Sequence, residues 1–329
     1  MHTLPLRIVA STVLTSTRCR AFPSTQLITL PAIPPPSLVS IVIPTFNSQR
    51  YIRQCLQSVA RQTYAAIELI IVDGGSTDGT MDIVAQSSLA LAAVECRGGL
   101  LAARVLGGSL SHGPFIFLLD SDQVIAPDLI YRAVALMDAR AYDMLALEEQ
   151  VRAPHTFTER ILSLDKRLIH AESVLDPFRG VILPRFFRRW LWQAAVSAVP
   201  PNIVQSVGGQ DHSIIFAEAW SYSQRIGLLP NAVEHQEASS ARALVHKGFR
   251  WGYTSVALTD PTKSSARYRT LRHAKVRLRP GTFRPALWRE SLGSLCVLAL
   301  KGAPYLLGVA CAATWGRAKG RFMRPTQTD

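Results

Sequence analysis

Short apolar runs alternate with longer amphipathic segments from about residue 38 to residue 150. The runs are rich in Ile, Val, Leu and Phe and are bounded by Pro, Gly or Asp, which is typical of buried strands. Strands that alternate with helices through short loops predict an α/β fold with a doubly wound, mostly parallel sheet. The expected strands are residues 40–44, 67–72, 92–96, 115–119 and 142–147, and the expected helices are 47–62, 81–86, 100–110 and a segment after 127.

The two ends of the chain differ from this central region. Residues 1–37 are rich in Ser, Thr and Pro, contain no acidic residue and include three consecutive prolines near their end. We expect a disordered N-terminal tail, because no apolar core followed by a small-residue cleavage site marks a signal peptide. The α/β domain is expected over residues 38–240, followed by a basic amphipathic region at 241–290 and an apolar, membrane-associating segment with a basic tail at 291–329.

Residues 291–315 form the one long apolar stretch and are long enough to span a bilayer. Lys301 lies at its centre, Pro304 follows, and both flanks are basic, so the charges favour no single orientation. Each half is too short to cross a membrane alone. We therefore expect a re-entrant or interfacial helical pair with both ends on the cytoplasmic face. A buried helical hairpin of a soluble domain is the alternative.

The composition indicates an anionic partner. The 329 residues carry a net charge of +13, much of it between residues 242 and 289. Nucleic acid, a membrane surface and phosphorylated substrates are the partner classes that such a charge attracts. The basic block contains no recognised nucleic-acid module and precedes an apolar stretch, so we expect an anionic membrane surface and no nucleic acid. Five scattered cysteines without a C-x-x-C pair indicate a reducing compartment rather than a disulfide scaffold or a zinc site.

Polar side chains follow three of the predicted strands. Thr45 and Asn47 follow the first strand, Asp73 the second, and Asp120 and Asp122 the fourth. Strand ends that neighbour one another in a doubly wound sheet direct their loops to a common crevice. Two carboxylates one residue apart suit Mg²⁺ or Mn²⁺, which take one or two protein carboxylates and complete their shell with phosphate oxygens and water. For each residue alone, turn chemistry or helix capping is the alternative.

These segments together resemble the family 2 glycosyltransferases, which have the GT-A fold. The resemblance is carried by SIVIPTFN at 40–47, the helix at 51–62, IELIIVDGGSTDGT at 67–80, AAR at 102–104 and FIFLLDSD at 115–122, and more weakly by FFRR at 186–189 and QDH at 210–212. It covers roughly residues 38–150 strongly. Where relatives usually carry Glu-Asp before the acceptor helix, this chain has Gln210-Asp211.

The resemblance implies a role for each matched residue. The nucleoside pocket would be lined by Pro44, Thr45, Asn47 and Asp73, and Arg104 would face the diphosphate. Asp120 and Asp122 would bridge ribose, metal and diphosphate, with Asp122 the more direct ligand of Mn²⁺ or Mg²⁺. Asp211 would be the catalytic base. For Asp211, the alternative is a helix N-cap role. Glu148 and Glu149 are rival candidates for the base. His235 is a candidate metal or phosphate ligand.

The implied reaction is the transfer of a sugar from a nucleoside diphosphate sugar, with inversion, to an acceptor hydroxyl or a lipid phosphate. The expected partners are the donor, a saccharide or lipid-linked acceptor and the membrane. The expected setting is the cytoplasmic membrane face, in polysaccharide, glycolipid or glycoprotein glycan assembly. Because Gln210 replaces an acidic neighbour of Asp211, a non-catalytic nucleotide-sugar-binding or scaffold protein is the second hypothesis.

Overall fold

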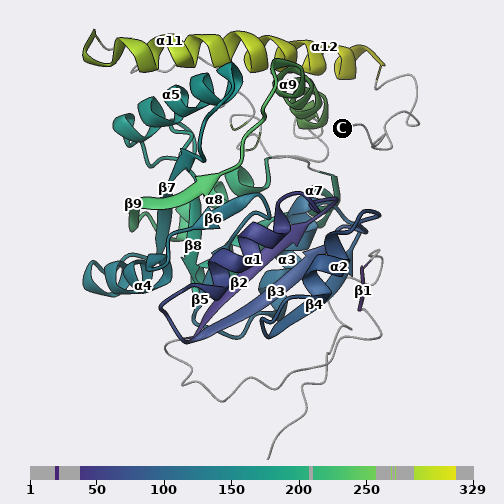
Figure 1. Cartoon of the computed structure of the whole chain (residues 1–329), viewed down its shortest axis with the longest axis vertical. Helices are drawn as coiled ribbons and strands as arrows, with labels where there is room; N and C mark the ends of the chain where they lie inside the picture. Colours follow the sequence, from purple (N-terminus) through teal and green to yellow (C-terminus); the bar gives the residue numbers. More distant parts are fainter. Residues whose placement is uncertain are drawn as a thin grey trace, which may run out of the picture.

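A nine-stranded sheet with the order β1-β4-β3-β2-β5-β8-β7-β9-β6 organises the protein (Figure 1). The computed structural model describes residues 19–21, 38–206, 210–256, 268, 271 and 285–315. The strands are β1 (Cys19–Ala21), β2 (Val39–Thr45), β3 (Ile67–Asp73), β4 (Leu91–Cys96), β5 (Phe115–Leu118), β6 (Gln123–Ile125), β7 (Met144–Val151), β8 (Pro184–Arg188) and β9 (Ile226–His235). The helices are α1 (Ile52–Ala60), α2 (Thr80–Ala85), α3 (Leu100–Leu110), α4 (Leu129–Ala139), α5 (Phe157–Glu172), α6 (Arg189–Ala198), α7 (Pro201–Ser206), α8 (Asp211–Tyr222), α9 (Ala241–Ser255), α11 (Trp288–Val297) and α12 (Ala303–Trp315).

The first four predicted strands form a parallel unit, as expected. β2 pairs in parallel with β3 and with β5, and β3 pairs in parallel with β4. Thr45 lies opposite Asp73 in this register. The second half of the sheet is mixed, because β8 inserts antiparallel between β5 and β7, and β7 then pairs in parallel with β9. The α/β prediction is therefore confirmed, with parallel pairing concentrated in the first half of the sheet.

Side chains of successive residues point to opposite faces of the sheet and supply two cores. Val42 packs in the core that α3, α6 and α8 cover, whereas Ile41 and Ile43 pack in the core on the face of α1 and α4. Helix α3 lies close against the sheet at Gly107. A Cβ atom at that position would lie 2.3 Å from Cγ1 of Val42, so no larger residue fits without a shift.

A layer of helices lies beside this sheet domain. Figure 1 shows α11 and α12 as one long helix, with α5 and α9 between it and the sheet. A π-helical turn at Leu298–Gly302 joins α11 to α12. The predicted helical pair is therefore wrong, since the chain does not reverse at Pro304. The wider π turn, in which Ala303 N–H donates to the carbonyl of Leu298, accommodates the nearby proline within a continuous helix.

Glycines bring α9 and the long helix into close contact. A Cβ atom at Gly248 would lie 2.4 Å from the carbonyl oxygen of Lys301, and one at Gly252 would lie 1.9 Å from that of Tyr305. Gly308 of α12 approaches the carbonyl of Phe249 in the same way. Such small residues let two helix backbones approach closely, as they do in membrane proteins.

The opposite face of the long helix is exposed and apolar. The segment Pro285–Ala312 is long and apolar enough to cross a membrane. Of its most apolar stretch of 18 residues, 28% is buried in the protein. At ~1.5 Å per residue, this length exceeds the ~30 Å hydrocarbon core of a bilayer. Trp288 and Arg289 are exposed at the start of the helix, and the exposed residues that follow on this face are Leu292, Ala299, Ala303, Leu306, Leu307 and Ala310.

Some sequence-based expectations fall outside the described residues. The predicted N-terminal tail does so except for β1, which pairs antiparallel with β4. Most of the basic run 267–279 also lies outside them, as does the basic tail after residue 315. The predicted boundaries at residues 240 and 290 stay predictions.

Candidate active site

The loops that follow β2, β3 and β5 meet at the carboxyl edge of the parallel strands. The N–H of Gly74 donates to the carbonyl of Thr45 at 2.7 Å, and the hydroxyl groups of Ser48 and Ser121 lie 2.9 Å apart. These contacts join the loop after β2 to the loops after both neighbouring strands. The sequence predicted a ligand crevice at this edge of the sheet, and these contacts between the loops agree with that prediction.

Asp73 and Asn47 shape this crevice through local hydrogen bonds. The Asp73 carboxylate accepts hydrogen bonds from the N–H groups of Gly75 and Ser76 at 2.9 and 2.8 Å. Asn47 adopts a positive φ of 48°, and its side-chain oxygen accepts a hydrogen bond from Thr77 N–H at 2.9 Å. Both side chains therefore fix the turn after β3, which is the turn-chemistry alternative, while standing where the nucleoside pocket was predicted.

Thr45 differs from these two residues. Its side chain is buried, and its hydroxyl oxygen has no hydrogen-bond partner among the residues that the structure describes. Buried hydroxyl groups normally find a partner, so this group is suited to a ligand atom. Pro44 precedes it within β2, opposite Val72 of β3.

Asp120 lies between two arginines. Its Oδ1 accepts a hydrogen bond from Nη2 of Arg104 at 2.5 Å, and its Oδ2 accepts one from Nη1 of Arg185 at 2.7 Å. Burial by itself would raise the pKa of Asp120, but the charges of Arg185 and Arg104 hold it well below its usual range. Asp120 is thus ionised, and each of its oxygens already has a cationic partner.

Arg104 connects Asp120 to the predicted base. Its Nε donates to Oδ2 of Asp211 at 2.5 Å, and its side chain is 1% exposed. Arg104 was predicted to face the diphosphate, but it lies buried between two aspartates, with only Nη1 lacking a partner among the described residues. Asp211 is the first residue of α8 and is itself 3% exposed.

Asp122 faces a different partner, on the open side of the site. Its carboxylate lies 3.1 Å from Nε2 of His235, at the end of β9, and its side chain is about a third exposed. Nδ1 of His235 lies 3.0 Å from both Glu237 Oε1 and Lys166 Nζ. Burial would lower the pKa of His235, but Glu237 and Asp122 raise it to about 9. The protonated ring therefore donates from Nδ1 to Glu237 and from Nε2 to Asp122.

A second ionic cluster surrounds Glu149. Its carboxylate accepts hydrogen bonds from Nε of Arg185 at 2.9 Å and from Nζ of Lys166 at 3.0 Å. Burial opposes ionisation of Glu149, but Lys166 and Arg185 lower its pKa. A carboxylate held by two cations is a poor proton acceptor, which argues against Glu149 as the base.

Asp122 and His235 fit a divalent metal better than Asp120 does. A carboxylate and a neutral imidazole are both ligands for Mn²⁺, so a metal bound here would take the place of the Nε2 proton of His235. Asp122 is accessible, whereas Asp120 is engaged with two arginines. Within the described ranges, no group of three or more His, Cys, Asp or Glu side chains is arranged to hold a metal ion. A metal here would thus take the remaining ligands from substrate phosphate and water, as Mg²⁺ and Mn²⁺ commonly do.

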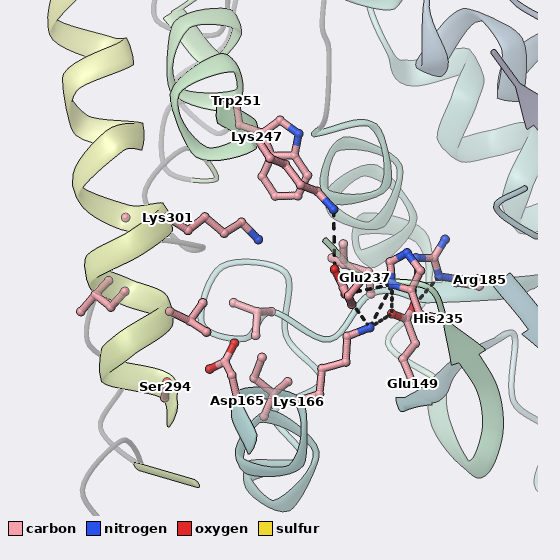
Figure 2. Close-up of a pocket in the computed structure, with 16 residues that line it drawn as sticks. Glu149, Asp165, Lys166, Arg185, His235, Glu237, Lys247, Trp251, Ser294 and Lys301 are labelled. Carbon is pink, nitrogen blue, oxygen red and sulfur yellow. Dashed lines mark hydrogen bonds and ion pairs between the residues drawn. The ribbon is translucent and has the colours of Figure 1, made fainter. Parts of the chain in front are cut away.

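A cavity of about 240 Å³ adjoins this cluster, between the sheet domain and the long helix. Figure 2 shows the ionic cluster on one side and the side chains of Lys247, Trp251 and Lys301 on the other. Lys247 and Trp251 come from α9, and Lys301 comes from the π turn of the long helix. The apolar part of the wall consists of Ile169, Val181, Leu183, Val297 and Leu298.

Sequence reasoning did not identify the residues that connect these groups. Arg185, Lys166 and Glu237 were not singled out, although Arg185 immediately precedes the recognised run FFRR. Arg185 is central because β8 lies between β5 and β7, a pairing that no local pattern reveals. His235 had been noted only as a lone candidate, and the structure brings it to Asp122.

Residues 40–172 match the family model described as Glycosyl transferase family 2. The chain carries a family 2 glycosyltransferase domain. GlyG of Streptococcus pneumoniae, named a glycosyltransferase, is 33% identical over 110 residues, which are 31% of this chain and 36% of GlyG. An uncharacterized glycosyltransferase of Haemophilus influenzae is 34% identical over 105 residues, which are 30% of this chain and 42% of that protein. The matched region therefore spans less than half the length of these relatives.

Two solved structures are similar to this family 2 domain and the helices after it. The mannosyltransferase PcManGT from Pyrobaculum calidifontis, in complex with GDP-Man and Mn²⁺, has a TM-score of 0.51 and 19% identity, covering 89% of this chain and 84% of that one. Staphylococcus aureus TarS 1–349, in complex with UDP-GlcNAc, has a TM-score of 0.50 and 17% identity, covering 87% and 93%. These similarities support the GT-A fold that the sequence predicted.

Proposed function

We propose that this protein transfers a sugar from a nucleoside diphosphate sugar, with inversion, to an acceptor hydroxyl or a lipid phosphate. The observation that carries this proposal is the buried chain of contacts Asp211–Arg104–Asp120–Arg185 beside Asp122 and His235. It lies at the edge of the sheet where the loops after β2, β3 and β5 meet, within or next to the matched family 2 domain.

The donor occupies the crevice at the strand ends in this proposal. Pro44, Thr45, Asn47 and Asp73 line the nucleoside pocket, and the unpartnered hydroxyl of Thr45 supports that assignment. Asp122, together with His235 once its Nε2 proton is lost, would hold Mn²⁺ or Mg²⁺, and the metal would neutralise charge on the leaving diphosphate. Arg104 and Arg185 keep Asp120 ionised and fixed beside this position. The Mn²⁺ and GDP-Man bound to PcManGT agree with such a donor.

The acceptor approaches from the side of α8. For a hydroxyl acceptor, Asp211 is the proposed base, because a carboxylate is needed to take the hydroxyl proton as the new bond forms. Its contact with Arg104 fixes its rotamer and couples it to Asp120. The N-terminal position of Asp211 in α8 also lets it act as a helix-end residue, so both roles are compatible.

The long helix places the enzyme at a membrane in this proposal. From Leu292 to Ala310 its outward face is a stripe of Leu and Ala residues, whereas its inner face packs on α5 and α9. A helix that is covered by protein along one side and apolar on the other is suited to lie in the plane of the interface. The excess of Lys and Arg favours an anionic leaflet on the cytoplasmic side.

Donor binding and turnover can be tested separately. A panel of nucleotide sugars is titrated into the purified full-length chain with and without Mn²⁺, and release of nucleoside diphosphate is then followed with native membrane extract. Mn²⁺-dependent binding and turnover of one donor support the proposal. Binding without turnover on any acceptor supports the scaffold alternative, and absence of binding to every donor contradicts both.

A further inference from the structure

A cationic position within the apolar helix is the starting point. Lys301 lies in the π turn near the middle of the long helix and points into the cavity rather than to the exposed face (Figure 2). A lysine within a segment of membrane-spanning length is costly and is typical of a functional position. Its ammonium nitrogen lies 4.3 Å from the ring centroid of Trp251.

A second lysine reaches the same ring from α9. Nζ of Lys247 lies 5.3 Å from the Trp251 ring centroid and 3.8 Å from Oε2 of Glu237. Two ammonium groups near one ring repel each other, and an anion bound near both would relieve that repulsion. Across the whole cavity wall, the four Lys and Arg side chains Lys166, Arg185, Lys247 and Lys301, together with the His235 ring, exceed the three acids Glu149, Asp165 and Glu237.

The cavity is also divided in a way that suits an amphiphile. Its charged side chains stand next to Asp122 and His235, where the proposed donor diphosphate would be held. The apolar part of its wall includes Val297 and Leu298 of the long helix. A ligand with an anionic head and a long apolar chain would satisfy both parts, and its chain would continue along the membrane face of the helix.

Two of the three carboxylates of the wall are poorly placed to take a proton. Glu149 contacts Lys166 and Arg185, and Glu237 contacts Lys166 and Lys247. Asp211 is buried behind this wall and is held by Arg104. An acceptor that is already ionised has no proton to lose, so it fits this arrangement better than a hydroxyl group does.

We infer that the acceptor is a membrane lipid phosphate, held by Lys301 and Lys247, whose ammonium groups both lie near the Trp251 ring. This inference rests on the proposed sugar transfer. A phosphate oxygen of the lipid attacks the anomeric carbon of the donor sugar and forms the new C–O bond. The bond from that carbon to the nucleoside diphosphate breaks, and its electron pair goes to the diphosphate oxygen. The lipid phosphate loses one negative charge, the nucleoside diphosphate gains one, and no proton moves.

Binding of the acceptor can be measured without turnover. The full-length chain in detergent micelles is titrated with a polyisoprenyl monophosphate, with the corresponding polyisoprenol and with inorganic phosphate, and tryptophan fluorescence reports ligand in the cavity. We expect the lipid phosphate to bind at least about tenfold more tightly than either of the others, since a charge-assisted contact contributes that much. If the polyisoprenol binds as tightly as the lipid phosphate, the cavity has no phosphate site. If inorganic phosphate binds as tightly as the lipid phosphate, the cavity does not recognise the lipid chain.

Single substitutions test whether Lys301 and Lys247 bind the lipid phosphate. Lys301→Met and Lys247→Met should each weaken binding of the lipid phosphate about tenfold, while Lys301→Arg retains most of it. Arg167→Gln is the matched control, because Arg167 is an exposed cation of α5 that does not line the cavity. The affinity of this variant for the lipid phosphate should change less than about twofold. Wild-type affinity in both methionine variants overturns the inference.

Donor binding separates this inference from the proposed function. Mn²⁺-dependent binding of the nucleotide sugar should be unchanged in Lys301→Met and Lys247→Met. If a donor is bound and transferred only to soluble hydroxyl acceptors, the proposed function holds and the lipid phosphate inference fails. If the lipid phosphate binds as expected but no donor binds, the proposed function fails.

Discussion

Arg104 and Asp211 are 107 positions apart in the chain, yet Nε of Arg104 donates to Oδ2 of Asp211 at 2.5 Å. The same guanidinium group binds Asp120, so helix α3 connects the end of β5 to the start of α8. The aspartate pair of the donor site and the proposed base therefore belong to one ionic network. This relationship makes specific predictions for Asp211.

Asp211→Asn should separate the two acceptor chemistries. With a hydroxyl acceptor, loss of the base should lower kcat by about 100-fold or more, because general base catalysis contributes about 10²–10⁴-fold. With a lipid phosphate acceptor, no proton is transferred, and kcat should fall by only about tenfold through the weakened contact with Arg104. The measurement is kcat on each acceptor at saturating donor. Asp128→Asn, an exposed helix-end variant, is the control and should leave kcat unchanged.

Removal of Arg185 should destabilise the protein. Arg185→Met leaves the partly buried carboxylates of Asp120 and Glu149 without the buried cation that they share, and losing one member of a buried ion pair costs about 3–5 kcal/mol. Arg152→Met removes an exposed pair with Glu234 instead and should cost less than about 1 kcal/mol. Urea unfolding followed by circular dichroism gives both values. Equal losses for the two variants would show that the buried cluster is not a stabilising network.

Glu68 should make stability depend on pH in the acid range. Its carboxylate accepts hydrogen bonds from Ser40, from the N–H of Gly113 at 3.1 Å and from His112. Burial opposes ionisation, but these hydrogen bonds lower the pKa of Glu68 below its ordinary value of 4.5. A carboxyl group whose folded pKa is lowered contributes stability above pH 4.5 that is lost as the pH falls through the lowered value.

Comparison of Glu68→Gln with the wild type measures this contribution. The difference in unfolding free energy should be largest above pH 5 and should shrink as the pH decreases below about 4.5. Glu234→Gln, at an exposed position, is the control and should show a much smaller dependence on pH. A difference for Glu68→Gln that stays constant between pH 3 and pH 7 would contradict the assignment.

The contact between α9 and α12 should depend on the absence of a side chain at Gly252. In Gly252→Ala, the new methyl group would lie 1.9 Å from the carbonyl oxygen of Tyr305, so the two backbones must separate. Overpacking of this kind costs about 1–3 kcal/mol. Gly302→Ala is the matched control in the long helix, because the nearest atom there is the end of the Leu298 side chain. Thermal unfolding should show a lower Tm for Gly252→Ala than for Gly302→Ala.

Local patterns predicted the donor side of the molecule well. The strands before Thr45, Asp73 and Asp120 follow from apolar runs and their terminating residues, and parallel pairing brings their ends together. The partners of these residues come from distant segments. Arg185 reaches Asp120 only because β8 inserts into the sheet antiparallel, and His235 reaches Asp122 through the pairing of β6 with β9.

The course of the long helix was the main structural error of the sequence prediction. Lys301 and Pro304 indicate a break when they are considered in isolation. In the structure, a π turn accommodates the proline, and the lysine points into a cavity between helices rather than to the exposed face. Both outcomes depend on packing against α9, whose close approach at Gly248 and Gly252 is a tertiary property.

The central claim, transfer of sugar from a nucleotide donor held at Asp122, has one direct test. Each labelled nucleotide sugar is incubated with Mn²⁺, native membrane lipids and either wild-type chain or Asp122→Asn, and label in the organic phase is compared with nucleoside diphosphate released. The wild type should move label into lipid with equal release of nucleoside diphosphate, and Asp122→Asn should reduce both about 100-fold, as expected for a lost metal ligand. Transfer at the wild-type rate by Asp122→Asn would contradict the account.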